Sequence, residues 1–118
     1  MCGTHYSGLI AWQRALDLTE AVYVGTQSMP KDERFGLTRQ LRRAAASIPA
    51  NIAEGQARKV NAVFRNHASI ALGSVAELET HLLLAKRLKF ITPESAQCLL
   101  AQAAEVGRLV SGLHRSLQ

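Results

Sequence analysis

Aromatic residues are scarce in this sequence, at 5% of 118 residues, and it holds only two cysteines and three prolines. The shortage of aromatics beside abundant Ala and Leu favours close-packed helices over sheets. Uninterrupted apolar runs, such as residues 82–85, are far below the ~18 residues that a membrane span needs, so no membrane contact is expected. Cys2 and Cys98 lack zinc or redox spacing, and the N-terminus shows no signal peptide. We therefore expect reduced thiols and a cytoplasmic location.

The charge balance is the most informative property of the composition. Fourteen Lys and Arg residues oppose nine Asp and Glu residues, which gives a formal net charge of +5 and a pI near 9.8. A basic domain of this size tends to meet anionic partners such as nucleic acid, although a well-solvated surface is an equal alternative. With 47% hydrophobic residues, the chain is long enough to bury one core in one domain.

The first half of the chain contains two amphipathic segments separated by Met29-Pro30. Residues 1–8 lack periodicity and are predicted to form a flexible tail, so the bundle domain is expected to span 9–118. The first helix is predicted to run to about Ser28, with a core-facing stripe of Leu9, Trp12, Leu16, Thr19 and Tyr23, widened by Ala15 and Val22. The second helix is predicted to start directly after Pro30 and to kink or break at Pro49. Its predicted core-facing residues are Leu37, Leu41, Ala44, Ala45, Ile48 and Ile52.

The second half contains two further segments with the same periodicity. A third helix is predicted from an Asn61 cap to about Lys89, with the stripe Phe64, Ala68, Ala71, Val75, Leu78, Leu82 and Ala85. A fourth follows a Thr92 cap with Pro93 at the first helical position, and its stripe is Ala96, Leu99, Ala103, Val106, Val110, Leu113 and Leu117. Four such segments with short connections predict an all-α, antiparallel up-and-down four-helix bundle.

Polar residues lie beside the apolar stripes of the second and third segments. A hairpin about residues 60–61 brings Ser47 close to Ser74, and Asn51 close to Ile70. Gly73 inside a helix costs ~1 kcal/mol, which indicates a close approach of another backbone. We expect a polar network that has a structural role, in fixing helix register or a subunit interface. A binding pocket or a catalytic carboxylate site is the alternative. The network residues are Ser47, Asn51, Glu54, Ser74 and Glu77.

Patterns for catalysis and cofactor binding are missing from the sequence. There is no P-loop, dinucleotide fingerprint or hydrolase elbow. The four histidines are scattered, and Glu-x-x-His, which a di-metal bundle needs, does not occur. We therefore expect no enzyme activity, no metal and no cofactor.

Several of these residues also form one longer pattern. It combines Trp12, Ala15 and Leu18 with Pro30, Glu33, Gly36 and Leu37, and continues through residues 40–45, 47–55, 71–74 and 77–80. Its central string, Ser-Ile-Pro-Ala-Asn-Ile-Ala-Glu-Gly at 47–55, is specific. Over about residues 9–117 the chain resembles the four-helix bundle family of the protein encoded by intervening sequences in 23S ribosomal RNA genes. The resemblance implies a ring-like homo-oligomer, typically a homopentamer, and a fold shared with the accessory variability determinant of diversity-generating retroelements.

Charge and assembly together suggest two hypotheses for function. Five copies would carry about +25, five times the protomer's +5, and a charge of this size favours binding of nucleic acid. The first hypothesis is a homo-oligomer that binds RNA or DNA through backbone phosphates with low sequence preference, because few aromatics are present for base stacking. The second is an accessory subunit for a protein partner such as a reverse transcriptase. The expected phosphate-binding residues are Arg39, Arg42, Arg43, Arg58, Lys59, Arg65, Lys86, Arg87 and Lys89.

Overall fold

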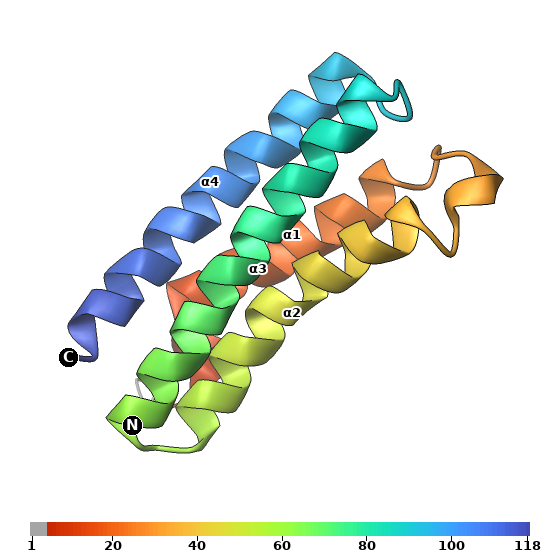
Figure 1. The fold of residues 1–118 in the computed structure, drawn as a ribbon. Coiled ribbons are helices and arrows are strands. Elements are labelled where there is room, and N and C mark those ends of the chain that lie inside the picture. The colour runs from red at the N-terminus through yellow and green to blue at the C-terminus, as the bar shows by residue number, and fades with distance from the viewer. Residues whose placement is uncertain (1–4) are drawn as a thin grey trace.

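The computed structural model describes residues 5–118, and these form four α-helices arranged as an elongated bundle. The helices are α1 (Ile10–Gly25), α2 (Leu37–Ala57), α3 (Asn61–Arg87) and α4 (Pro93–Ser116). Each helix packs against the next in the chain, and α1 also packs against α4, so α2 and α4 lie on opposite corners of the bundle. The predicted all-α, up-and-down four-helix bundle is confirmed (Figure 1).

The core stripes of α2 and α3 are confirmed residue by residue. All six apolar residues predicted for α2 and all seven predicted for α3 are buried. In α4, five predicted residues are buried, while Leu113 and Leu117 pack at the margin of the core. By length and composition α3 could also cross a membrane. Length and composition of one helix are weak evidence for a membrane span. The apolar stripe of α3 packs in the core, and this accounts for the hydropathy of the helix.

The predicted core face of α1 is confirmed only in part, because Ala15 and Val22 are buried and Leu9 and Trp12 pack against the core, but Leu16 and Tyr23 do not. Leu16 and Tyr23 are about half exposed, and the buried residues are Ala11, Ala15, Leu18 and Val22. Apolar residues occupy both faces of this helix, so periodicity alone does not separate them. The small side chains at 11 and 15 allow α1 to lie close to its neighbours, and this decides which face turns inward.

The predicted start of α2 is also wrong. A short 3-10 helix, η3 (Lys31–Glu33), follows Pro30, and α2 begins only at Leu37. The carboxylate Oε1 of Glu33 accepts a hydrogen bond from the Leu37 amide at 3.2 Å. Glu33 therefore caps α2 from outside rather than lying within its first turn. As a result, Arg34 and Phe35 belong to an exposed turn.

Pro49 leaves α2 continuous, although we expected a kink or break there. A proline at this position cannot donate to the carbonyl of Ala45, four residues earlier. The hydroxyl of Thr19 in α1 lies 3.0 Å from that carbonyl oxygen and 2.8 Å from the carbonyl oxygen of Ala15, and its one hydrogen is shared between these two acceptors. A side chain from the neighbouring helix thus satisfies the acceptor that the proline leaves unpaired.

The close approach between helices occurs at Gly55 rather than at Gly73. A Cβ atom at Gly55 would lie 2.7 Å from Cβ of His67 and 3.0 Å from a ring carbon of Phe64, so only glycine lets α2 and α3 meet there. A Cβ at Gly73 would meet nothing within 4 Å. The expectation that Gly73 serves packing within the bundle is therefore wrong, because its side of α3 faces away from the other described helices.

The ends of the elements differ from the prediction in detail. Asn61 is the first residue of α3 and Val60 precedes it as the cap, without a side-chain hydrogen bond. Lys59 and Lys89 follow α2 and α3 with φ angles of 60° and 62°, the left-handed conformation that terminates a helix. The predicted cap of α4 is confirmed, since Thr92 accepts a hydrogen bond from the Ser95 amide at 3.1 Å.

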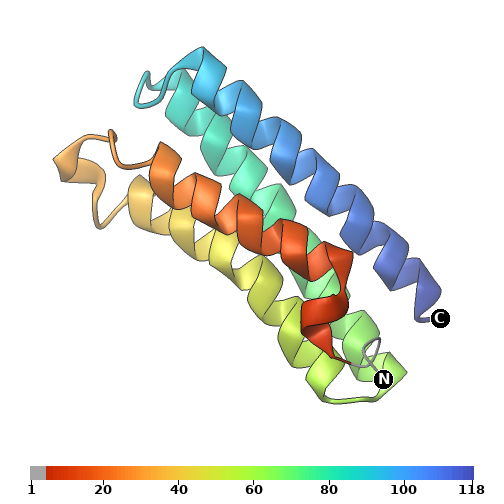
Figure 2. The ribbon, with the colours of Figure 1, turned by 180° about the vertical axis from the view of Figure 1, so that it is seen from behind.

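Part of the predicted N-terminal tail is folded onto the bundle. Residues 1–4 lie outside the described chain, but Tyr6–Gly8 forms a 3-10 helix, η2, beside the start of α1 (Figure 2). The ring of Tyr6 packs edge-on against Trp12, with ring centroids 5.2 Å apart. The side-chain Nε2 of Gln13 donates to the carbonyl of Ser7 at 2.8 Å. These contacts, which local periodicity does not reveal, join Tyr6 and Ser7 to α1.

Candidate nucleic-acid interface

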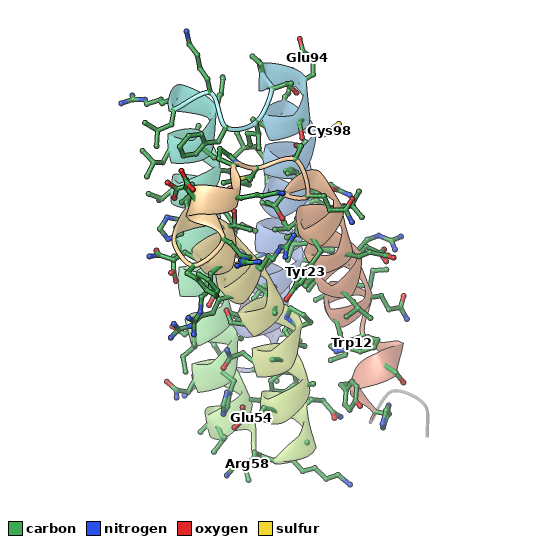
Figure 3. All side chains as sticks on the ribbon, turned by 90° about the vertical axis from the view of Figure 1, so that its right-hand side faces the viewer. Trp12, Tyr23, Glu54, Arg58, Glu94 and Cys98 are labelled. Atoms are coloured by element: carbon green, nitrogen blue, oxygen red, sulfur yellow. The ribbon has the colours of Figure 1, made fainter. Side chains whose placement is uncertain are left out.

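The nine predicted basic residues gather near the two ends of the bundle. Because α2 and α3 are antiparallel, the start of α2 and the end of α3 lie at one end, and the hairpin between them lies at the other (Figure 1). Figure 3 shows Glu54 and Arg58 at the hairpin end and Glu94 at the opposite end. The molecule is 44 Å long, so a single phosphate group cannot contact both ends.

A hollow at the start of α2 holds the densest group of arginines. We call it the arginine groove; its volume is about 480 Å³, and it is lined by Tyr23, Arg34, Phe35, Thr38, Arg39, Arg42 and Arg43. The residues come from α1, from the turn before α2 and from the first two turns of α2. Three of the nine predicted residues, Arg39, Arg42 and Arg43, therefore share one concave surface with a fourth arginine and two aromatic rings.

Arg42 has a structural role within the arginine groove. Its Nε donates to the hydroxyl of buried Thr26 at 2.9 Å, and a terminal nitrogen donates to the carbonyl of Tyr23 at 3.3 Å. Its guanidinium carbon also lies 4.7 Å from the centroid of the Tyr23 ring. The side chain thus ties α2 to the last turn of α1, where a positive charge complements the helix dipole. Arg39 and Arg43 are exposed and form the more available pair.

Sequence reasoning missed three residues of this surface, namely Tyr23, Arg34 and Phe35. Tyr23 was placed on the core face of the first helix, and Arg34 and Phe35 fell inside a helix that starts later in the structure. The available signal was Glu33 four residues before Leu37, a spacing that suits a side-chain cap. Thr38 also lines the groove, and its buried hydroxyl has no hydrogen-bond partner among residues 5–118.

The basic residues at the hairpin end are dispersed or engaged. Arg58 lies 4.0 Å from Glu54, and both side chains are exposed. Arg65 donates to the carbonyl of Leu117 at 3.3 Å, which ties the start of α3 to the end of α4. Lys59 borders a separate hollow between the hairpin and the C-terminal residues. The structure does not bring these three residues into one shared hollow.

The lysines and arginine at the end of α3 face two different hollows. Lys86 and Lys89 line one together with Phe90 and Ile91, near the start of α4. Arg87 lines another with Leu83 and Leu84 on the outer side of α3. These residues add positive charge to the end of the bundle that carries the arginine groove, but they form no part of its wall.

The predicted polar network is only partly assembled. Ser47, Asn51, Ser74 and Glu77 line one groove of about 470 Å³ between α2 and α3, beside Gln40, Arg43, Ala44 and Ile70. Glu54 is not among the lining residues, and its ion-pair partner is Arg58. Four of the five predicted residues therefore lie together between α2 and α3, and Glu54 does not.

Hydrogen bonding in this polar groove differs from the expected reciprocal set. Ser47 donates to the carbonyl of Ala44 at 2.8 Å, and Asn51 donates to the carbonyl of Ser47 at 2.8 Å. The partner of Asn51 across the interface is His67, whose Nδ1 lies 3.0 Å from Oδ1 of Asn51. Sequence reasoning missed His67, although it lies one turn from Ile70, the residue placed opposite Asn51. Glu77 lies 3.5 Å from His81 on its own helix.

Within residues 5–118, no group of three or more His, Cys, Asp or Glu side chains could hold a metal ion. Cys98 is a free, exposed thiol on α4. Cys2 lies outside the described residues.

Comparisons with known proteins agree with the fold and with the resemblance. The family described as "23S rRNA-intervening sequence protein" matches residues 7–112. A crystal structure at 1.70 Å of a protein with unknown function, from the S23 ribosomal protein family of Bacteroides thetaiotaomicron, superposes with a TM-score of 0.83. That protein is 24% identical, and the match covers 90% of this chain and 96% of the other. A search of curated proteins finds no match.

Proposed function

Because the chain belongs to the 23S rRNA-intervening sequence protein family, we propose that it is a non-enzymatic, homo-oligomeric protein that binds nucleic acid through backbone phosphates. The observation that carries this proposal is the arginine groove, where Arg34, Arg39, Arg42 and Arg43 line one surface. Within residues 5–118, none of these four arginines forms an ion pair with an Asp or Glu carboxylate, so their charge is not neutralised by an acidic neighbour there. Guanidinium groups suit phosphate because they donate in a planar fork.

The surface of α3 supports the oligomeric part of the proposal. Gly73 lies on this surface without any contact that explains a glycine. Leu83 and Leu84 on the same helix, and Leu88 directly after it, are 43–50% exposed. A second copy packed against α3 would cover these side chains and approach closely at Gly73. Repetition of the arginine groove around a ring would multiply the field that attracts a polyanion.

Binding of a mixed-sequence RNA, followed by fluorescence anisotropy over a salt titration, tests the proposal. We expect binding at low salt that weakens by about 300-fold or more between about 50 and 200 mM salt if six or more phosphates of a single strand are contacted. Sequence-scrambled RNAs of equal length should bind with similar affinity, because phosphate contacts carry no sequence information. Absence of binding at low salt would refute the proposal.

The alternative, an accessory subunit for a protein such as a reverse transcriptase, stays a prediction from the resemblance. No observation in the structure favours it over the nucleic-acid role. Co-purification that recovers the bundle alone would count against it.

A further inference from the structure

The arginine groove contains a large aromatic ring that phosphate binding alone does not use. Phe35 is 74% exposed, the highest value among the exposed large apolar side chains of residues 5–118. An exposed ring of this size loses the free energy that burial would give it. Because Phe35 lines the arginine groove, its exposed ring is available to a ligand that enters the groove.

Hydrogen bonds fix the backbone of the turn that carries Phe35. The turn before α2 is closed by a hydrogen bond from the Gly36 amide to the carbonyl of Glu33 at 3.0 Å, and by the bond from the Leu37 amide to the Glu33 carboxylate. The guanidinium carbon of Arg34 lies 4.8 Å from the centroid of the Phe35 ring and supports it. Because the backbone of the turn is already ordered, only the side chain of Phe35 loses conformational freedom when a flat ligand packs on its ring.

The surroundings of the ring define the chemistry of that ligand. Arg39 and Arg43 are exposed on the same groove wall. The volume of about 480 Å³ falls in the range of pockets for small molecules, so the groove can take a group of nucleotide size. A flat π-face beside guanidinium groups suits a ligand with a base and phosphates.

We propose that the arginine groove seats an unpaired nucleotide of a single-stranded nucleic acid, with its base stacked on Phe35 and its flanking phosphates on Arg39 and Arg43. This inference rests on the proposed function and adds a preference for single strands. In a duplex each base stacks on its own neighbours and is closed to a protein ring, whereas single strands can offer a base. Such stacking tolerates any base, so it remains compatible with low sequence preference.

The test compares a short mixed-sequence RNA with the same RNA paired to its complement. Wild type is measured beside Phe35→Leu, which keeps an apolar side chain without a π-face, and Phe35→Tyr, which keeps the ring. We expect Phe35→Leu to weaken single-strand binding about tenfold and to leave duplex binding unchanged, with Phe35→Tyr close to wild type. A fluorescent purine analogue in the single strand should be quenched by wild type and by Phe35→Tyr, and not by Phe35→Leu.

The outcomes separate this inference from the proposed function. If all three proteins bind both RNAs alike with the expected salt dependence, the stacking seat is wrong and phosphate binding stands. If wild type binds neither RNA at low salt, the proposed function fails and the inference with it. If Phe35→Leu instead lowers the mass in solution, the ring covers a second copy of the chain, and the nucleotide seat is overturned.

Discussion

Thr19 and Pro49 show how one side chain makes an unusual residue acceptable in a helix. Pro49 removes the donor that would pair with the Ala45 carbonyl, and the Thr19 hydroxyl, 3.0 Å away, replaces it. Asn51 and Gly55, in the same string, both contact His67 of α3. Asn51 makes a hydrogen bond to the His67 ring, and Gly55 leaves room for the His67 side chain. The string at 47–55 is thus explained by packing and hydrogen bonding between helices.

This pairing predicts an energetic coupling between the two residues. Thr19→Val keeps the shape and removes the hydroxyl, so the Ala45 carbonyl loses its partner and stability falls by about 1–2 kcal/mol. Pro49→Ala restores a backbone donor, and in that background we expect Thr19→Val to cost under about 0.5 kcal/mol. Urea unfolding of the four proteins in the cycle measures the coupling. Equal costs of Thr19→Val in both backgrounds would contradict this account.

At the scale of the helix, the start of α2 positions the arginine groove. The Glu33 carboxylate caps Leu37 from outside the helix and closes the turn that holds Arg34 and Phe35. Its negative charge also lies at the positive end of the helix dipole. A change at Glu33 therefore affects both the helix and the shape of the groove.

We expect Glu33→Ala to destabilise the protein by about 1 kcal/mol, in line with the loss of a helix cap. Asp32→Ala is the control, because Asp32 is an exposed carboxylate in the same 3-10 helix and makes none of the cap contact. Thermal unfolding by circular dichroism distinguishes the two. Equal shifts for both variants would show that charge, and not the hydrogen bond to Leu37, determines the effect.

The elements differ in how far the sequence predicts them. The stripe of α3 was predicted in full because its seven apolar residues form one face, whereas α1 carries Leu16 and Tyr23 beside the buried Leu18 and Val22. Which of those faces turns inward depends on contacts with two other helices, so local periodicity cannot decide it. The arginine groove was found only in part for the same reason. Its α2 residues follow from helix spacing, but its aromatic rings depend on where the preceding turn ends.

At the scale of the whole molecule, the open side of α3 predicts assembly. We expect light scattering to give a mass of about 64 kDa, five times the 12.8 kDa of one chain, if the ring is a pentamer. Gly73→Leu adds a side chain where the protomer has open space, so the protomer should fold while its assembly is blocked. Gly112→Leu on α4 is the matched control, since a Cβ there meets only a nitrogen of Arg115 at 3.8 Å.

The mass measurements have a clear opposite outcome. A mass of one chain for wild type, or the same assembly in Gly73→Leu as in Gly112→Leu, would contradict a contact between copies at α3. In that case the exposed leucines of this helix would need another explanation.

The salt dependence of RNA binding in two charge-matched variants tests the central claim most directly. Arg39→Gln/Arg43→Gln removes two charges from the arginine groove, and Arg14→Gln/Arg108→Gln removes two from α1 and α4, away from it. If the groove holds phosphates, the negative slope of log K against log salt should become shallower by about 1.4 in the first variant, for a single strand. The second variant should keep a slope near that of wild type. Equal changes in both variants would show that net charge alone attracts the RNA and that the groove has no special part.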